Sequence, residues 1–192
     1  MKEVLFFSHN HNKYKEIKKI FTHSNIKIHN LNLFKKIKEP KETGNSFAIN
    51  AKIKSYTGYK LFNLPCFADD SGICIDALGG RPGVKSKRFL NQFSNHEDAF
   101  NFIIKKVKNK KNANASFVTT ICLTLKESHH IIFTGKINGR ISLEPMGENG
   151  FGYDPIFIPE NCIRTFAEMS SLKKNKISHR KIAVTKLKSF LF

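Results

Sequence analysis

Tryptophan is absent from this 192-residue sequence, and acidic residues are scarce, with 15 Asp and Glu against 33 Lys and Arg. The resulting net charge of +18 predicts a strongly electropositive surface. Such a surface attracts nucleic acids, anionic membranes and phosphorylated small molecules alike, so the charge favours an anionic ligand without selecting one. Lys, Asn, Ile and Phe are abundant throughout, as expected from an AT-rich coding sequence, and this bias is a competing explanation of the charge.

Cysteine is also rare, and no two cysteines have the CxxC spacing of a zinc or redox site. Each cysteine lies in or beside an apolar run, which predicts buried, reduced thiols rather than a disulfide framework. The residues concerned are Cys66, Cys74, Cys122 and Cys162.

Long apolar runs are missing as well. None approaches the roughly 20 residues that a membrane-spanning helix needs. The stretch at residues 1–7 is too short, and ends too soon in polar residues, for a signal peptide. We therefore expect a cytoplasmic protein that binds no membrane. The length suits one domain, residues 1–192, with two lobes that share a sheet as one possible arrangement.

The pattern of apolar residues alternates between strand and helix spacing, which predicts an α/β fold with a mixed sheet. Expected strands cover residues 4–7, 26–31, 64–68, 115–125, 131–137 and 156–158. Expected helices cover residues 13–21, 46–61, 94–107 and 174–190, and the strands at 115–125 and 131–137 form a hairpin.

Two adjacent acids, Asp69 and Asp70, follow the apolar run at residues 64–68, where we expect a buried strand to end. Carboxylates at such a place are costly unless a cation lies beside them, and Asp oxygens suit a hard ion such as Mg²⁺. The alternative is a solvated turn, because Asp, Ser and Gly all favour turns.

Other polar segments supply further parts of a possible site. Residues 8–13 form a polar loop between a strand and a helix, a place where backbone N–H groups can bind phosphate, although the glycines of a Walker loop are absent. Phosphate donors would be Ser8, Asn10, Lys13, Ser71 and Lys174, with Glu42, Asp69 and Asp70 as acids for a metal. Phe151 offers an aromatic platform, and Asp154, His179 and Arg180 could contact a base edge. Together these residues indicate a nucleotide-hydrolysing site.

The chain also resembles the inosine triphosphate pyrophosphatase family over nearly its whole length. The resemblance lies in six segments that occur in family order: residues 8–13 (SHNHNK), 42–47 (ETGNSF), 68–72 (ADDSG), 76–83 (DALGGRPG), 150–155 (GFGYDP) and 177–180 (ISHR). It implies hydrolysis of ITP, dITP and XTP to the monophosphate and pyrophosphate. It further implies a long mixed sheet flanked by helices, two lobes with the active site in the cleft between them, Mg²⁺ as cofactor, and a homodimer.

The resemblance also assigns roles to residues. Asp70 would be the general base, and Glu42 and Asp70 would bind Mg²⁺. Phe151 would stack on the base, and Arg180 would donate to its 6-oxo oxygen. The full set of expected substrate-binding residues is Ser8, His9, Asn10, His11, Asn12, Lys13, Ser71, Phe151, Gly152, Tyr153, Asp154, Lys174, His179 and Arg180.

The sequence departs from the family pattern in a few places. His9 stands where glycine is usual, which predicts altered geometry in the first phosphate loop. Asn149 replaces a frequent glycine with little expected effect, because Asn tolerates left-handed conformations. The residues Lys85, Lys87 and Phe89 replace common Tyr, Ala and Tyr.

A basic nucleic-acid-binding protein without nucleotide turnover is the alternative from another functional class. It requires basic residues interleaved with exposed aromatic residues, and it does not require Glu42, Asp69 and Asp70 to lie together. Salt-sensitive DNA binding without turnover would favour it. The enzyme interpretation expects no specific nucleic acid partner.

Overall fold

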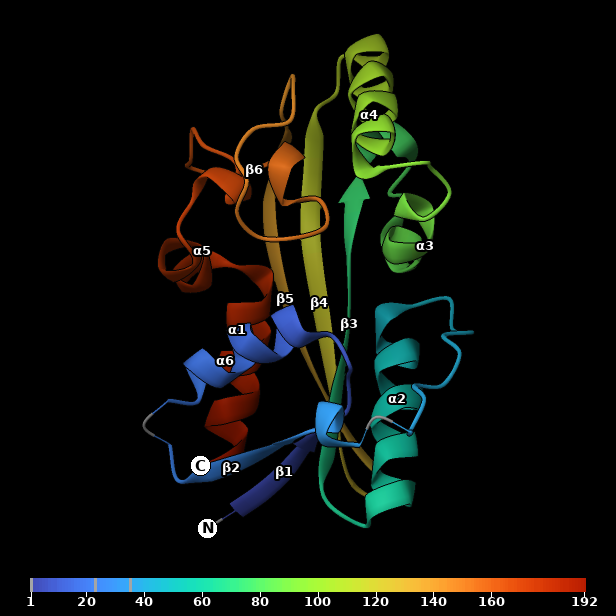
Figure 1. Ribbon diagram of the computed structural model, residues 1–192, viewed down its shortest axis with the longest axis vertical. Helices are drawn as coiled ribbons and strands as arrows, with labels where there is room; N and C mark the ends of the chain where they lie inside the picture. Colours follow the sequence, from blue (N-terminus) through green and yellow to red (C-terminus); the bar gives the residue numbers. More distant parts are fainter. Residues whose placement is uncertain (1, 23, 35) are drawn as a thin grey trace. The chain divides into compact units, whose positions relative to one another are not determined.

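The computed structural model describes residues 2–22, 24–34 and 36–192 (Figure 1). They form two compact units, which we describe separately. Unit 1 comprises Met1–Asp70, Thr119–Gly135 and Arg180–Phe192, and unit 2 comprises Ser71–Val118 and Lys136–His179. Three long strands have residues in both units: β3 (Cys66–Ile75), β4 (Asn114–Lys126) and β5 (His129–Ile141).

The strands form a mixed sheet in the order β2-β1-β3-β4-β5-β6. β1 (Lys2–Phe6) pairs in parallel with β2 (Ile26–Asn30) and with β3, whereas β5 pairs antiparallel with β6 (Phe157–Pro159). This arrangement confirms the predicted α/β class with a mixed sheet. The single domain over residues 1–192 and the cleft between lobes stay predictions.

In unit 1 the alternation of side chains along β1 sends neighbouring residues into two different cores. Val4 and Phe6 pack on one face with α1 (His11–Ile20) and α6 (His179–Leu191). Leu5 and Phe7 belong to the core on the other face, where α2 (Phe47–Phe62) packs. Figure 1 shows α1 and α6 on one side of these strands and α2 on the other. The two faces of the sheet are therefore covered by helices, as predicted.

Unit 2 is built around the apolar half of β3, where Ile73 and Ile75 are fully buried. They pack with Ile103 of α4 (His96–Lys110) and with two buried phenylalanines, Phe157 and Phe166. Two shorter helices complete the unit, α3 (Ser86–Leu90) and α5 (Ser171–Ile177). The short 3-10 segment Phe166–Glu168 begins with a capping box between Thr165 and Glu168.

The expected end of a strand at the acidic pair is wrong. β3 does not stop after residue 68 but continues through Asp69 and Asp70 to Ile75. A solvated turn is wrong too, because only 0% and 4% of Asp69 and Asp70 are exposed. The strand can pass through this point because Lys13 and Arg180 lie beside Asp69 and Asn50 donates a hydrogen bond to Asp70.

Helix boundaries required smaller corrections. The first helix begins at His11, because the Asn10 side chain caps it by accepting from the Lys13 N–H. The helix expected over residues 174–190 is two helices, α5 and α6, separated at Ser178, whose backbone is extended (φ −68°, ψ 153°). The helix expected from residue 94 begins at His96, where the Asn95 side chain caps it by accepting from the Asp98 N–H. The helix expected from residue 46 begins at Phe47, where the Ser46 side chain caps it by accepting from the Ile49 N–H.

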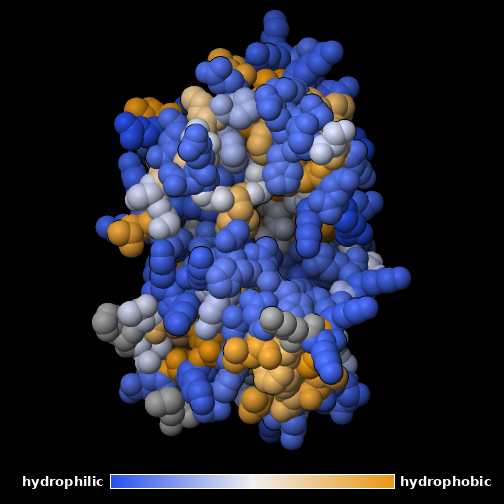
Figure 2. All heavy atoms as spheres, in the orientation of Figure 1, coloured by the Kyte–Doolittle hydropathy of each residue, from blue (hydrophilic) through white to orange (hydrophobic). Residues whose placement is uncertain are grey.

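Most of the face in Figure 2 is hydrophilic, in keeping with the net charge of +18. Some large apolar side chains of unit 1 are nevertheless exposed, among them Leu33 and Leu61. Within the described ranges, no helix is long and apolar enough to cross a membrane.

Candidate functional site

The charged side chains of unit 1 gather around the acidic pair in β3. We call this group the charged cluster, and its members are Lys13, Glu16, Glu42, Lys54, Asp69, Asp70 and Arg180. At its centre the Lys13 Nζ lies 2.9 Å from Asp69 Oδ2, and the Arg180 Nε lies 3.8 Å from the same oxygen. Both cations therefore compensate the fully buried Asp69 carboxylate.

Arg180 is itself buried, with only 2% of its surface exposed. Its Nη1 forms an ion pair with Glu16 Oε2 on α1. The guanidinium thus contacts carboxylates of two different elements, α1 and β3. Sequence reasoning assigned Arg180 to the base of the substrate, whereas the structure places it among the acids of unit 1.

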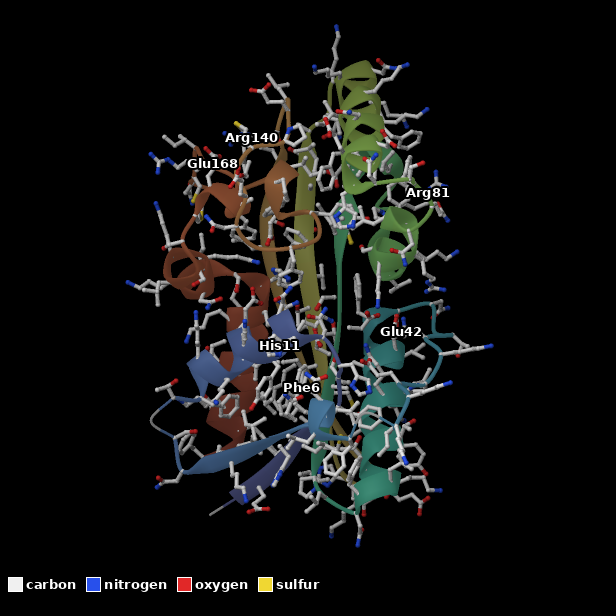
Figure 3. All side chains as sticks on the ribbon, in the orientation of Figure 1. Phe6, His11, Glu42, Arg81, Arg140 and Glu168 are labelled. Carbon is white, nitrogen blue, oxygen red and sulfur yellow. The ribbon has the colours of Figure 1, made fainter. Side chains whose placement is uncertain are left out.

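Lys54 forms an ion pair with Glu42, the acid that precedes α2. Its Nζ donates to Glu42 Oε1 over 2.6 Å, from a position on α2 that is 3% exposed. Burial alone would lower the pKa of Lys54, but the surrounding carboxylates outweigh burial and raise this pKa. Those carboxylates belong to Asp69, Glu42 and Asp70. Figure 3 shows Glu42 near the first turn of α2.

Asp70, the predicted general base, is buried and accepts a hydrogen bond of 2.9 Å from Asn50 Nδ2. Burial raises the pKa of its carboxyl, while the charge of Lys54 and the bond from Asn50 oppose this shift. A carboxyl with a raised pKa is a better proton acceptor near neutral pH than an ordinary Asp.

The cations of the charged cluster crowd one another as well. Burial lowers the pKa of Lys13, the charges of Lys54 and Arg180 lower it further, and Asp69 opposes them. The seven members carry three cations and four carboxylates, a formal net charge of −1. All three cations are therefore already engaged with acids.

The predicted phosphate loop is anchored to the segment before α2. The Glu39 Oε1 accepts from the His9 N–H at 2.6 Å and from the Ser8 hydroxyl at 3.3 Å. The His9 ring contacts Asn32 Oδ1 (3.2 Å) and the Ile37 carbonyl oxygen (2.6 Å). The ring is therefore an anchor of this loop rather than a solvated side chain.

The remaining members of the expected loop lie in or beside the first turn of α1. The side chains of Asn10, His11 and Asn12 are exposed, and Figure 3 shows His11 at this end of the helix. Lys13 points its ammonium at Asp69.

A second group of functional candidates lies in unit 2. We call it the aromatic–lysine cluster, and its members are Phe151, Asp154, Phe166 and Lys174. The buried Lys174 Nζ donates to Asp154 Oδ2 at 2.7 Å and lies 4.7 Å from the ring centre of Phe151. The same Asp154 oxygen accepts from the Phe151 N–H at 2.8 Å. Phe151, Asp154 and Lys174 are therefore linked directly to one another by hydrogen bonds and a cation–π contact.

A glycine makes this connection possible. Gly150 has a φ of +80°, and a Cβ at this position would collide with the Asp154 carboxylate. Asn149 is not among the described residues with positive φ, whereas Gly147 and Gly152 are.

Two expected substrate-binding residues of unit 2, Tyr153 and His179, have contacts within the protein core. Tyr153 is buried in the apolar core, its hydroxyl donates to the Ser86 carbonyl, and burial raises the pKa of this hydroxyl. The buried His179 ring stacks on Phe117 at 4.7 Å with an interplanar angle of 8°. Ser71, in β3, is half-buried.

Comparison with known proteins gives one consistent result. Residues 4–190 match the sequence model of the Ham1 family. The chain belongs to the Ham1 family. A dITP/XTP pyrophosphatase of Flavobacterium johnsoniae is 40% identical over 187 residues, which cover 96% of this chain and 95% of that protein. A dITP/XTP pyrophosphatase of Bacillus subtilis is 37% identical, over 100% of this chain and 98% of that protein.

Solved structures of Ham1 proteins agree. The structure of a HAM1 protein from Coxiella burnetii has a TM-score of 0.90 and 35% identity, and the match covers 100% of this chain and 98% of that one. The Staphylococcus aureus Ham1 protein has a TM-score of 0.85 and 34% identity, over 99% of this chain and 98% of that one. The fold predicted from the resemblance is therefore the fold of the Ham1 family.

Sequence reasoning missed several polar residues of this Ham1 chain that contact the predicted site residues, among them Glu16, Asn50 and Lys54. A signal for two of them was present. Asn50 and Lys54 lie four positions apart on α2, on the helix face that also buries Ala51. Polar side chains on the buried face of a helix require partners, so their presence pointed to the acids. For Glu16 we find no such signal.

Proposed function

We propose that this chain hydrolyses non-canonical purine nucleoside triphosphates, namely ITP, dITP and XTP, to the monophosphate and pyrophosphate. Such a reaction removes damaged purine nucleotides from the precursor pool. Membership of the Ham1 family and the activity named for the relatives support the proposal. They do not favour the alternative of a nucleic-acid-binding protein without turnover.

The observation that carries the proposal is the charged cluster. Carboxylates and cations are buried together in it. The desolvation cost of buried charges often exceeds the gain from their pairing, so stability alone does not explain this arrangement. It suits phosphoryl chemistry, in which water attacks phosphorus and negative charge grows on the phosphate oxygens. Lys13 and Lys54 would stabilise that charge, and Asp70 would orient the water and accept its proton.

We propose that Mg²⁺ completes the site, held by Glu42 and Asp70. Their carboxylate oxygens are suitable ligands, and the charge of Glu42 contributes to the raised pKa of Asp70, so the two lie within electrostatic range. Among the described residues, no three His, Cys, Asp and Glu side chains converge into a ready-made metal site. Mg²⁺ commonly uses only one or two carboxylates together with substrate phosphates and water. The ion would offset the net negative charge of the cluster and polarise the phosphate.

For the base we propose that Phe151 provides the stacking surface, with Gly152 and Asp154 beside it. Arg180 would donate to the 6-oxo oxygen of hypoxanthine or xanthine. Adenine has an amino group there and would leave the donor unpaired, which is the strongest available basis for discrimination.

A pyrophosphate-release assay tests the proposed function. Inosine, xanthosine, guanosine and adenosine triphosphates are compared at equal concentration with Mg²⁺. We expect release from inosine and xanthosine triphosphates and little from the other two. Turnover of none of the four, or equal turnover of all four, would contradict the proposal.

We further propose that the protein acts as a cytoplasmic homodimer. The four cysteines support a reducing compartment, since all are free, with Cys66 and Cys122 buried. The proposal of a dimer rests on the family resemblance. Size-exclusion chromatography with light scattering tests it by measuring whether the mass in solution is that of one chain or of two.

The anchoring of the phosphate loop gives a prediction for His9. His9→Gly removes both ring contacts and restores the residue usual in the family. At a net of about 0.5–1.5 kcal/mol per hydrogen bond, the two contacts together contribute about 1–3 kcal/mol, so we expect KM for the triphosphate to rise roughly 5- to 150-fold. We expect kcat to change little, because the hydrogen bonds of His9 are to Glu39, Asn32 and Ile37, which lie outside the charged cluster. An unchanged KM would show that Glu39 alone holds the loop.

A second prediction concerns the stacking surface. Base stacking on an aromatic ring contributes roughly 1–3 kcal/mol by alanine substitution. Phe151→Ala should therefore raise KM for every purine substrate by a similar factor and leave the preference unchanged. Phe102→Ala, at a partly exposed ring on α4, is the matched control. A selective loss with one base only would show that Phe151 reads the base edge instead of stacking.

A further inference from the structure

Asn50 is a fully buried polar residue on α2, and both ends of its amide are occupied. Its Nδ2 donates to Asp70 Oδ2 over 2.9 Å. Its Oδ1 accepts from the Gly44 N–H over 2.8 Å. Exposure of Asn50 is 0%, so these contacts replace water entirely.

The two partners fix the orientation of the amide. A backbone N–H can only donate, so the oxygen of Asn50 must face Gly44 and its NH₂ group must face Asp70. The Asp70 oxygen that receives this bond must act as an acceptor. The hydrogen bond from Asn50 therefore fixes the orientation of the Asp70 carboxylate, and it favours the ionised form of this group.

The other end of Asn50 reaches the segment that carries Glu42. Gly44 lies two residues after Glu42, and a Cβ on Gly44 would come within 2.7 Å of Asn50 Oδ1 and 2.5 Å of Ile49 Cγ2. Only glycine allows this segment to approach α2 so closely. One helical turn further on, Lys54 holds the Glu42 carboxylate itself.

We propose that Asn50 is a positioning residue of the reaction: its amide joins the general base Asp70 to the segment that carries Glu42. A small change in the distance between the Asp70 and Glu42 carboxylates would slow the reaction, because a metal ion and the attacking water must fit between their oxygens. The proposal rests on the proposed function, in which Asp70 and Glu42 act together. A purely structural Asn50 would contribute to stability alone.

Asn50→Asp separates these possibilities. The variant keeps the shape of the side chain and the acceptor for Gly44, but it turns an oxygen toward Asp70. We expect a folded protein whose kcat is lower by about 10- to 100-fold and whose magnesium requirement is higher, as for other changes in groups that orient ligands. KM for the triphosphate should change little. Asn95→Asp, the same change at the exposed cap of α4, should leave all kinetic constants unchanged.

A second measurement needs neither substrate nor metal. Combining Asn50→Asp with Asp70→Asn recreates a donor and an acceptor in reversed order. Because residues in one hydrogen-bonded pair are coupled, we expect the unfolding free energy of the double variant to exceed the value that adding the single effects predicts. Its turnover should stay as low as that of Asp70→Asn, since the base is now in the wrong place.

The outcomes are distinct. Wild-type kcat and magnesium dependence in a folded Asn50→Asp variant, or additive stabilities in the double variant, would overturn the proposal. If Asn50→Asp does not fold, Gly44→Ala tests the other end of the amide and should lower kcat while Asn50 is intact. An unchanged kcat there would also overturn it. A wild-type chain that hydrolyses none of the triphosphates would instead refute the proposed function, and with it any role of Asn50 in that reaction.

Discussion

Asp70→Asn is expected to lower kcat by about 10²- to 10⁴-fold, the usual contribution of a general acid or base. The change removes the proton acceptor and one carboxylate of the proposed Mg²⁺ pair. It leaves the fold intact, because the introduced amide has the same shape as the carboxylate and can turn its oxygen toward Asn50 Nδ2. Burial already disfavours the charge of Asp70 and raises its pKa, so a neutral amide costs little stability there.

The measurement is single-turnover and steady-state pyrophosphate release with inosine triphosphate, together with circular dichroism on the same samples. Asp98→Asn is the matched control, since Asp98 is exposed in the first turn of α4 and should not affect turnover. A soluble Asp70→Asn variant with nearly normal magnesium-dependent activity would remove Asp70 from the mechanism.

The end of β3 was a feature of the fold that could not be predicted from the sequence. The apolar residues on either side of Asp69 predicted strands correctly, because burial of alternating side chains is a local signal. Two adjacent carboxylates normally mark a strand end, and here they do not. The cations that compensate them, Lys13 and Arg180, come from distant parts of the sequence. Only the folded chain reveals that compensation.

The roles of the site residues show a similar division. Motifs selected Asp70, Lys174 and Phe151, and the last two do meet in one cluster. The partners of Asp70 and Glu42, Asn50 and Lys54, were not selected. Their position on the buried face of α2 indicates that they need polar partners, but it does not say which residues those partners are. Motif reading assigns chemistry to residues, whereas hydrogen-bond partners depend on the tertiary structure.

Arg180→Ala should have the largest effect on stability. The substitution removes a buried guanidinium that contacts both Glu16 and Asp69. Breaking a buried ion pair from one side leaves uncompensated charge and typically costs roughly 3–5 kcal/mol. Asp69 keeps Lys13, so the cost should lie toward the lower end of that range. Chemical denaturation measures it, with exposed Arg164→Ala as the matched control.

The same variant tests base recognition, because the two roles of Arg180 differ in substrate dependence. If the guanidinium donates to the 6-oxo oxygen, its loss removes a charged hydrogen bond of roughly 1.5–3 kcal/mol for inosine but not for adenosine triphosphate. The ratio of kcat/KM for the two substrates should then fall about 10- to 100-fold. Loss of the contact to Glu16 alone would slow both substrates equally. A second variant, Glu16→Gln, weakens that contact while Arg180 is present, so it should preserve the ratio if Arg180 reads the base. A constant ratio in Arg180→Ala, at a temperature where the variant is folded, would place base recognition elsewhere and leave Arg180 as the brace between α1 and β3.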